Sequence, residues 1–378
     1  MKLKQFIQQE TILLVATVLA VISAFFVQPD WHYMEYIDFH TLAILFSLMT
    51  VMAGLQRQGI FDQMGRRLLS HTGALFSLVL VLVGLCFFGS MFITNDVALL
   101  TFVPFTFVVL NNLGEQTRHR ILLPVVCMQT IAANLGSMLT PIGNPQNLYL
   151  YSKSSMSVLQ FIKWMLPYTM VSLALLVVWA FLLCGGQKEK LSSAVMAKGK
   201  DIPIRNHNKI VFFYIILFVL CLLTVVRVLP YNIVFVIVLA GTLCVDRITL
   251  CHVDYSLLLT FVAFFIFIGN LGRIPAFNIW LRDIISGREV LVSVMASQVT
   301  SNVPAALLLS GFTKNLEALM IGTNLGGLGT LIASMASLIS YRQIAREMPR
   351  KKGKYLGIFT LSNVLFLAIL LGVYCFVS

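Results

Sequence analysis

The sequence predicts an all-α polytopic membrane protein with about nine spans, two re-entrant hairpins and two broken helices, arranged as an inverted repeat. Apolar runs long enough to cross a bilayer recur along the chain, polar turns interrupt some of them, and the interrupted pattern occurs once in each half. The first observation gives the class of protein, and the other two give its internal architecture.

Composition places the chain in a membrane. Hydrophobic residues make up 58% of it and charged residues only 11%, and the mean hydropathy is +0.89. The net charge of +12 does not indicate nucleic-acid binding, because Lys and Arg lie between apolar runs, where they act as topology signals. The seven cysteines have neither metal-ligand spacing nor a paired framework, so we expect reduced packing residues and no cofactor.

The apolar runs divide the chain into its expected elements. The first run continues through Phe25 and Phe26 without a small-residue cleavage site, so we interpret it as a retained span rather than a secretion signal. The runs lie at 11–27, 41–56, 74–93, 97–112, 121–148, 164–184, 209–226, 231–245, 256–272, 289–313, 315–341 and 355–376.

The run at 121–148 cannot be one regular helix. Pro141 and Pro145 each remove a backbone donor and clash with the preceding turn, and Gly143 and Asn144 lie between them. In a bilayer, backbone groups left unpaired in this way are tolerated only where they are buried in protein or line a wet cavity. We therefore predict a broken helix whose gap faces a binding site.

The same pattern returns in the second half, in the run at 315–341. Residues 324–338 align without gaps on residues 134–148, and Asn, Gly and Thr recur at matching positions. Interrupted hydrophobic segments at matching positions of two halves are typical of an inverted-repeat transporter and mark its binding site. The predicted domains are a first repeat at 1–184, a cytoplasmic basic linker at 185–208 and a second, inverted repeat at 209–378.

Two pairs of apolar legs, at 74–112 and 289–313, are expected to be re-entrant hairpins. The first leg of the second pair is too short to span a bilayer at about 1.5 Å per residue. The internal repeat predicts that the first pair is a hairpin too. A hairpin at 74–112 places the larger share of Lys and Arg in the cytoplasm, as the positive-inside rule requires. The longer leg at 74–93 leaves open the alternative that it spans.

Each half also contains an amphipathic stretch after a span. Residues 61–69 follow the run at 41–56, and residues 277–285 follow the run at 256–272. In the predicted topology these two spans run in opposite directions, so the stretches are interpreted as helices at opposite membrane surfaces. The alternative is that they only fill surface loops.

Small polar residues form each hairpin tip: Thr94 and Asn95 at the first, and Thr300, Ser301 and Asn302 at the second. Where one helix ends and the next begins, free carbonyls and free amides face the same point. Oxygen ligands of this kind suit a hard cation such as sodium. The alternative is that Asn95, Asp96, Ser301 and Asn302 only cap the second legs.

Asp96 is an ionisable residue within an apolar stretch, which is costly and indicates a function. Three roles are open: ligand of a cation, proton carrier, or helix cap. Its counterpart in the second tip is Val303, so the two tips are not chemically equivalent.

The motifs Thr94-Asn95-Asp96, Thr140-Pro-Ile-Gly143-Asn-Pro and Thr300-Ser301-Asn302 together resemble the ion transporter superfamily. Within it the chain is similar to the citrate-transporter-like branch, which includes divalent anion/sodium symporters, arsenite permeases and sodium/proton antiporters. The resemblance implies a homodimer in the lipid bilayer whose hairpins and broken helices move as an elevator carrying a small-molecule or inorganic anion. It implies substrate or ion binding at Thr94, Asn95, Asp96, Gly143, Asn144, Asn147, Thr300, Ser301, Asn302, Ala333 and Ser334. Sodium is implied at two places, one with Thr94, Asn95 and Gly143 and the other with Ser301, Asn302 and Ala333.

Two departures from the anion symporters bear on the substrate. Asp96 stands where they have a threonine, and its charge would repel a dicarboxylate unless it is protonated or paired with sodium. The second broken helix has Ala333-Ser334-Met335 where they have a proline-rich turn. The first tip is more similar to that of the arsenite permeases, which argues against citrate or succinate.

The sequence therefore predicts a secondary active transporter of the inner (plasma) membrane, not an enzyme. We expect it to move a small organic carboxylate or inorganic oxyanion with sodium as the coupling ion. The alternatives are an arsenite or antimonite efflux permease, a sodium/proton antiporter and, from another class, a channel. The closed re-entrant tips disfavour a channel.

Overall fold

The computed structural model describes residues 10–69, 72–185 and 208–377, which fold almost entirely into helices. The predicted linker at 185–208 lies almost wholly outside the described residues. The first half contains α2 (Thr11–Phe26), α3 (His32–Tyr36), α4 (Phe39–Arg57), α5 (Ile60–Leu69), α6 (Leu75–Ile93), α7 (Asn95–Leu110), α8 (Glu115–Ser137), α9 (Pro145–Lys153) and α10 (Val158–Cys184). The second half contains α12 (Asn208–Val225), α13 (Tyr231–Asp246), α14 (Tyr255–Gly272), α15 (Pro275–Ile285), α16 (Glu289–Thr300), α17 (Asn302–Ser310), α18 (Leu316–Leu325), α19 (Met335–Glu347) and α20 (Lys352–Val377).

Seven helical segments of the described chain are long and apolar enough to cross a membrane, and shorter apolar helices accompany them. The predicted all-α polytopic fold is therefore confirmed. Both predicted hairpins are present as helix pairs, because α6 packs on α7 through the single connecting residue Thr94, and α16 packs on α17 through Ser301. Their re-entrant course stays a prediction, since α6 is itself long and apolar enough to cross a membrane.

Both helices predicted to be broken are interrupted. The gap in the first lies between Ser137 and Pro145, and the gap in the second lies between Leu325 and Met335. Pro145 occupies the first turn of α9, where its missing N–H costs little, and the Asn144 side chain caps that helix. The polar sequence between the prolines therefore starts a new helix rather than bending the old one.

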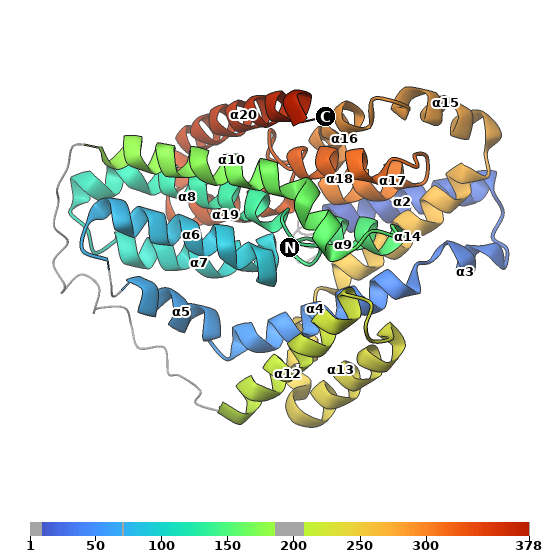
Figure 1. Cartoon of the computed structure of the whole chain (residues 1–378), viewed down its shortest axis with the longest axis horizontal. Coiled ribbons are helices and arrows are strands. Elements are labelled where there is room, and N and C mark those ends of the chain that lie inside the picture. The colour runs from blue at the N-terminus through green and yellow to red at the C-terminus, as the bar shows by residue number, and fades with distance from the viewer. Residues whose placement is uncertain (1–9, 70–71, 186–207, 378) are drawn as a thin grey trace.

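Helices of one half pack against corresponding helices of the other. The spans α4 and α14 pack on α13 and α2, and the half-helices α9 and α19 pack on the hairpin legs α17 and α7. Figure 1 shows α6, α7, α8 and α10 as a stack on one side, while α12 and α13 stand apart beside α4. The hairpins and broken helices thus form one body together with α10 and α20, which pack on α8, and α4 and α14 lie between this body and the helices α2, α12 and α13.

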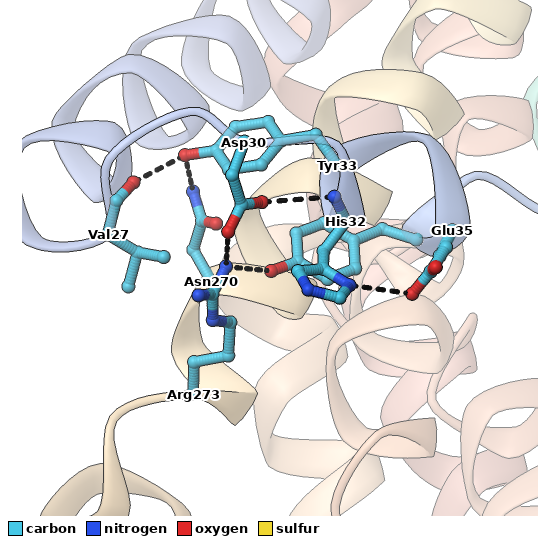
Figure 2. Close-up of polar contacts among 8 residues, drawn as sticks. Val27, Asp30, His32, Tyr33, Glu35, Asn270 and Arg273 are labelled. Atoms are coloured by element: carbon cyan, nitrogen blue, oxygen red, sulfur yellow. Dashed lines mark hydrogen bonds and ion pairs between the residues drawn. The ribbon is translucent and has the colours of Figure 1, made fainter.

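The C-terminal end of α14 is tied to the segment after α2 by an exposed polar cluster, drawn in Figure 2. Arg273 donates to Asp30 at 2.8 Å and to the Tyr36 hydroxyl at 3.1 Å. The hydrogen bond from Arg273 lowers the pKa of the Asp30 carboxyl below its usual value. The neighbouring Glu35 carboxylate, 2.9 Å from the His32 ring, raises the pKa of that imidazole.

The end of α4 is tied to α13 by a similar but less exposed cluster. Arg57 donates to Asp246 at 2.9 Å and to the Thr249 hydroxyl at 2.6 Å, and the Tyr214 hydroxyl donates to Asp246 at 3.3 Å. The Arg57 and Asp246 side chains are 18% and 12% exposed, against 42% and 35% for Arg273 and Asp30.

This difference in exposure predicts unequal effects of removing the two arginines. Arg57→Ala leaves the Asp246 carboxylate partly buried without its charged donor and is expected to destabilise the fold by about 2 kcal/mol. Arg273→Ala leaves Asp30 in water and should change stability little. Thermal unfolding of both variants in detergent measures the difference, and Arg57→Ala/Asp246→Asn should recover part of the loss. Equal melting temperatures for the two single variants would contradict this account.

Candidate functional site

Both hairpin tips turn through one residue in a backbone conformation that side chains seldom adopt. Thr94 has φ 66° and ψ 152°, and Ser301 has φ 77° and ψ 155°. For a residue with a Cβ this region costs on the order of 1–3 kcal/mol, so the surrounding structure must hold it. Neither side chain caps the helix that follows, so the capping alternative is wrong for Ser301.

A backbone hydrogen bond ties each tip to the gap of a broken helix. The Asn95 amide donates to the Gly143 carbonyl at 3.1 Å, and the Asn302 amide donates to the Ala333 carbonyl at 2.9 Å. These four residues occupy matching positions in the two halves. Each tip therefore meets the break of its own half part-way along the broken span.

A second pair of contacts repeats in the same way. The Thr140 hydroxyl donates to the Met91 carbonyl at 2.5 Å, and the Thr330 hydroxyl donates to the Gln298 carbonyl at 3.2 Å. The Gln298 side chain adds bonds of its own, because its oxygen accepts from the Thr330 amide at 2.8 Å. Each broken-helix gap is thus held to the first leg of its hairpin.

Asn134, near the end of α8, connects the first tip to the second half. Its side-chain oxygen accepts from Asn95 Nδ2 at 3.1 Å and from the Ser334 hydroxyl at 2.9 Å. Its amide nitrogen lies 3.5 Å from the Gly327 carbonyl. One buried amide thereby holds the first tip against the second broken helix.

Asn324 makes the reciprocal connection from α18 to the first half. Its Nδ2 donates to Asn147 Oδ1 at 2.6 Å, and its Oδ1 accepts from Asn144 Nδ2 at 3.1 Å. Asn134 and Asn324 recur in the repeat pattern, but their pairing across the two halves was not predicted. The occurrence of asparagine at both matching positions was the one feature of the sequence that could have indicated this pairing.

Most of the predicted site residues are brought together at this centre. Thr300 is an exception, because its side chain is exposed and its hydroxyl donates to the Ala296 carbonyl of its own helix. Ser301, one residue later, takes the position that Thr94 has in the first tip. The residues gathered at the two tips and gaps are Thr94, Asn95, Asp96, Gly143, Asn144, Asn147, Ser301, Asn302, Ala333 and Ser334.

A cavity of about 180 Å³ lies beside the first tip, between α4, α7 and the start of α14. One Asp96 carboxylate oxygen is buried and has no hydrogen-bond partner among the described residues. None of the described residues that line the cavity is Lys or Arg. Its polar lining consists of Gln56, Thr94, Asp96, Asn144, His252 and Asp254.

Asp254, the N-cap of α14, was missed by the sequence reasoning. It lines this cavity and a second one of about 160 Å³ that lies next to Val303, between α14 and α19. Burial raises the pKa of the Asp254 carboxyl, and the hydrogen bond from the Leu257 amide opposes that shift. The signal was its repeat partner Asp38, which caps α4 in the same way.

The helix ends give the centre a mixed electrostatic character. The helices α7, α9, α17 and α19 all begin there, so their unpaired N–H groups offer partial positive charge to an anion. The Gly143 carbonyl accepts only the Asn95 amide among the described residues and keeps a second lone pair for a cation, whereas the Ala333 carbonyl accepts from the Asn302 amide and, at 3.5 Å, from the Ser301 hydroxyl. The arrangement can therefore hold an anion and a cation near each other without a lysine or arginine.

Comparison with known proteins agrees with this architecture. Residues 6–322 match the family model described as citrate transporter, a range that contains both tips and the first broken helix. The transporter MJ0456 of Methanocaldococcus jannaschii is 33% identical over 306 residues, which are 81% of each chain. The inner membrane protein YbiR of Escherichia coli is 32% identical over 309 residues, which are 81% of this chain and 80% of that protein.

A shorter match links the chain to the silicon efflux transporter LSI3 of rice, which is 32% identical over 131 residues, 35% of this chain and 26% of that protein. The long matches and the apolar helices identify a multi-pass protein of the inner membrane and a membrane transporter. The chain belongs to the citrate transporter family.

Proposed function

We propose that the protein is a secondary active transporter that moves a small anion, an organic carboxylate or an inorganic oxyanion, together with sodium. The observation that carries this proposal is the convergence of four helix N-termini and the carbonyls of Gly143 and Ala333 at the paired tips, beside a cavity lined by Asp96. The anion is assigned to the amide side of this centre and sodium to the carbonyl and hydroxyl oxygens.

Asp96 sets a condition on the anion. A carboxylate at the tip repels a bound anion unless a cation neutralises it, so the coupling cation and the substrate bind together. The two proposed sodium positions, at Thr94, Asn95 and Gly143 and at Ser301, Asn302 and Ala333, place the cation next to the tip backbone. Neutralisation of Asp96 by sodium would thus be the step that couples the two solutes.

A second candidate function is sodium/proton exchange, and the lining of the first cavity favours it. Asp96 and Asp254 face one cavity that no described Lys or Arg lines, which is a suitable route for a cation alone. The similarity of part of the chain to a silicon efflux transporter supports a different alternative, in which the protein exports a small inorganic solute such as arsenite or antimonite.

The proposal includes the elevator motion and the homodimer. The hairpins and broken helices form one body bounded by α4 and α14, which suits movement as a unit. The pair α12 and α13 stands apart from that body and is the part of the chain that we assign to the dimer interface.

Transport into proteoliposomes under an imposed sodium gradient tests this function. We expect uptake of at least one member of a panel of arsenite, phosphate, sulfate and carboxylates to be driven by inward sodium. Asp96→Asn should abolish the sodium dependence, because the tip then has no carboxylate to neutralise. Asn112→Ala, an exposed asparagine on the far loop, is the matched control and should transport normally.

The same vesicles separate the alternatives. Uptake that follows a proton gradient and ignores sodium would contradict the sodium assignment. Internal acidification or alkalinisation driven by sodium without any anion would establish exchange instead. Unsaturable flux in the absence of any gradient would identify a channel.

A further inference from the structure

Gln146, the second residue of α9, has a buried side-chain amide without a hydrogen-bond partner. The residue is 1% exposed, and neither its Nε2 nor its Oε1 has a partner among the described residues. No other side chain in the described part of the chain has both amide atoms buried and unpaired. Leaving a buried amide unpaired is costly, because it has two donors and two acceptors to satisfy. Such a group is expected to be completed by a molecule that the chain itself does not supply.

The internal repeat shows that the fold does not require an amide at this position. Residues 324–338 align on residues 134–148, so Ala336 is the counterpart of Gln146. Each of the two residues is the second of its half-helix, and Ala336 is fully buried as well. A methyl group therefore fills in the second half the position that an amide fills in the first. The cost of burying the Gln146 amide has to be offset by something other than packing.

The neighbours of Gln146 on α9 show which way its side chain faces. Tyr149 and Lys153 follow it by three and seven residues, so the three side chains lie on one face of the helix. The Tyr149 hydroxyl lies 2.8 Å from the Ser310 hydroxyl, and the Tyr149 ring packs on α14. Lys153 donates to the Ser310 carbonyl at 3.1 Å. This face of α9 therefore packs against α17 and α14.

The same contacts place Gln146 beside the second tip. Lys153 and Ser310 are the last residues of α9 and α17, which are both nine residues long, so the two helices run side by side away from the centre. Gln146 is accordingly level with the first turn of α17. Its neighbour Pro145 lines the cavity of about 180 Å³ beside Asp96, and Val303 in that first turn lines the cavity of about 160 Å³. The flexible Gln146 side chain can thus reach a molecule that enters from either cavity.

We propose that Gln146 is a specificity-determining residue of the substrate site and that its amide selects a solute with a hydroxyl group. This inference rests on the proposed function, since it concerns the solute that the transporter binds. The amide nitrogen can donate to any anion, but the amide oxygen can only accept, so an anion without a proton leaves it unpaired. A solute that keeps an O–H donates to Oε1 and accepts from Nε2. The solute class is therefore hydroxycarboxylates and oxyacids that keep a proton, rather than fully ionised anions such as sulfate.

Matched pairs of solutes test this selectivity on the purified protein in a sodium buffer. The pairs are malate and succinate, phosphate and sulfate, and arsenite and nitrate; at neutral pH the first member of each keeps a hydroxyl group and the second has none. The measurement is the melting temperature as a function of solute concentration. We expect the hydroxylated member of at least one pair to bind at least about tenfold more tightly than its partner, because the partner leaves Oε1 unpaired.

Two substitutions distinguish selectivity from a structural role. Gln146→Met keeps an unbranched, flexible side chain and removes both polar atoms. The preference within the pairs should disappear, while the melting temperature without solute should stay the same or rise, because an unpaired group is removed. Gln129→Met is the matched control, since the buried Gln129 amide donates to the Leu82 carbonyl at 3.0 Å and to the Thr106 hydroxyl at 2.8 Å. It should lower the melting temperature and keep the preference.

Three results would overturn the inference. The first is a wild type that binds both members of every pair equally or binds neither. The second is a Gln146→Met variant that keeps the preference. The third is a Gln146→Met variant that melts as low as Gln129→Met or does not fold, because the amide would then serve the structure itself.

Transport into proteoliposomes separates this inference from the proposed function. A hydroxyl preference that depends on Gln146, in a chain that transports no solute with sodium, would support the inference and remove the proposed function. Sodium-driven uptake with equal affinity for the two members of every pair would do the reverse.

Discussion

Transport is expected to be lost when Asn134 is replaced by leucine, although the chain still folds and inserts. The Asn134 side-chain oxygen accepts from Asn95 of the first tip and from Ser334 of the second broken helix. Leucine removes this acceptor and leaves two buried donors unpaired, at a cost of about 1–3 kcal/mol each. The tip can then no longer be held against the opposite half in one position.

The measurement is transport in proteoliposomes together with the melting temperature of the purified protein. Asn363→Leu is the matched control, because Asn363 is also buried but, among the described residues, bonds only to the Phe359 carbonyl of its own helix. It should leave transport intact. Normal sodium-driven uptake by Asn134→Leu would show that the link between the halves is not required.

The largest effect on stability is expected from Gly136→Ala in α8. A Cβ at this position would lie 2.0 Å from the Phe87 carbonyl oxygen and 2.8 Å from Ser90 Oγ. The first contact is with backbone of α6, which cannot move without separating the hairpin from the broken helix. We expect the free energy of unfolding to fall by about 3 kcal/mol or more, the upper end of the range typical of overpacking. Transport should be lost as well.

Two other glycines serve as controls for this prediction. At Gly326, the repeat counterpart, an added methyl group would lie 2.6 Å from the Ser297 hydroxyl and 2.8 Å from the Gly322 carbonyl oxygen, which is less severe than 2.0 Å from a carbonyl oxygen, so Gly326→Ala should be milder. At Gly84, on α6 itself, the nearest atom lies 3.8 Å away, and alanine there should be neutral or slightly stabilising. Similar melting temperatures for Gly136→Ala and Gly84→Ala would contradict the packing account.

The breaks and tips were predictable because their signals are local. Proline and small polar residues inside an apolar run exclude a regular helix, whatever packs around them. For that reason Pro145 correctly marks the start of α9, and the residue pattern alone places the tips at Asn95 and Asn302. The continuation of α9 to Lys153 was not predicted, because the helix ends in the polar residues Ser152 and Lys153, which give no hydropathy signal.

The contacts between the two halves could not be predicted from the sequence. The choice between Thr300 and Ser301 at the second tip depends on a one-residue turn, and both residues offer a hydroxyl. The pairing of Asn134 with Ser334, and the place of Asp254 beside Asp96, depend on how distant helices pack. The residues around Asp254 in the sequence do not indicate a function. The only indication is its repeat partner Asp38, which is far away in the sequence.

The central claim is that the tips form a sodium site that involves Asp96. Binding of radioactive sodium to the purified protein tests it most directly, with wild type compared with Asn95→Ala and Asp96→Asn at pH 6 and pH 8. The account predicts saturable binding by the wild type, lost in both variants, and weaker binding at pH 6 wherever protons compete for the carboxylate. Absence of saturable binding at either pH, or binding that survives both substitutions, would contradict it.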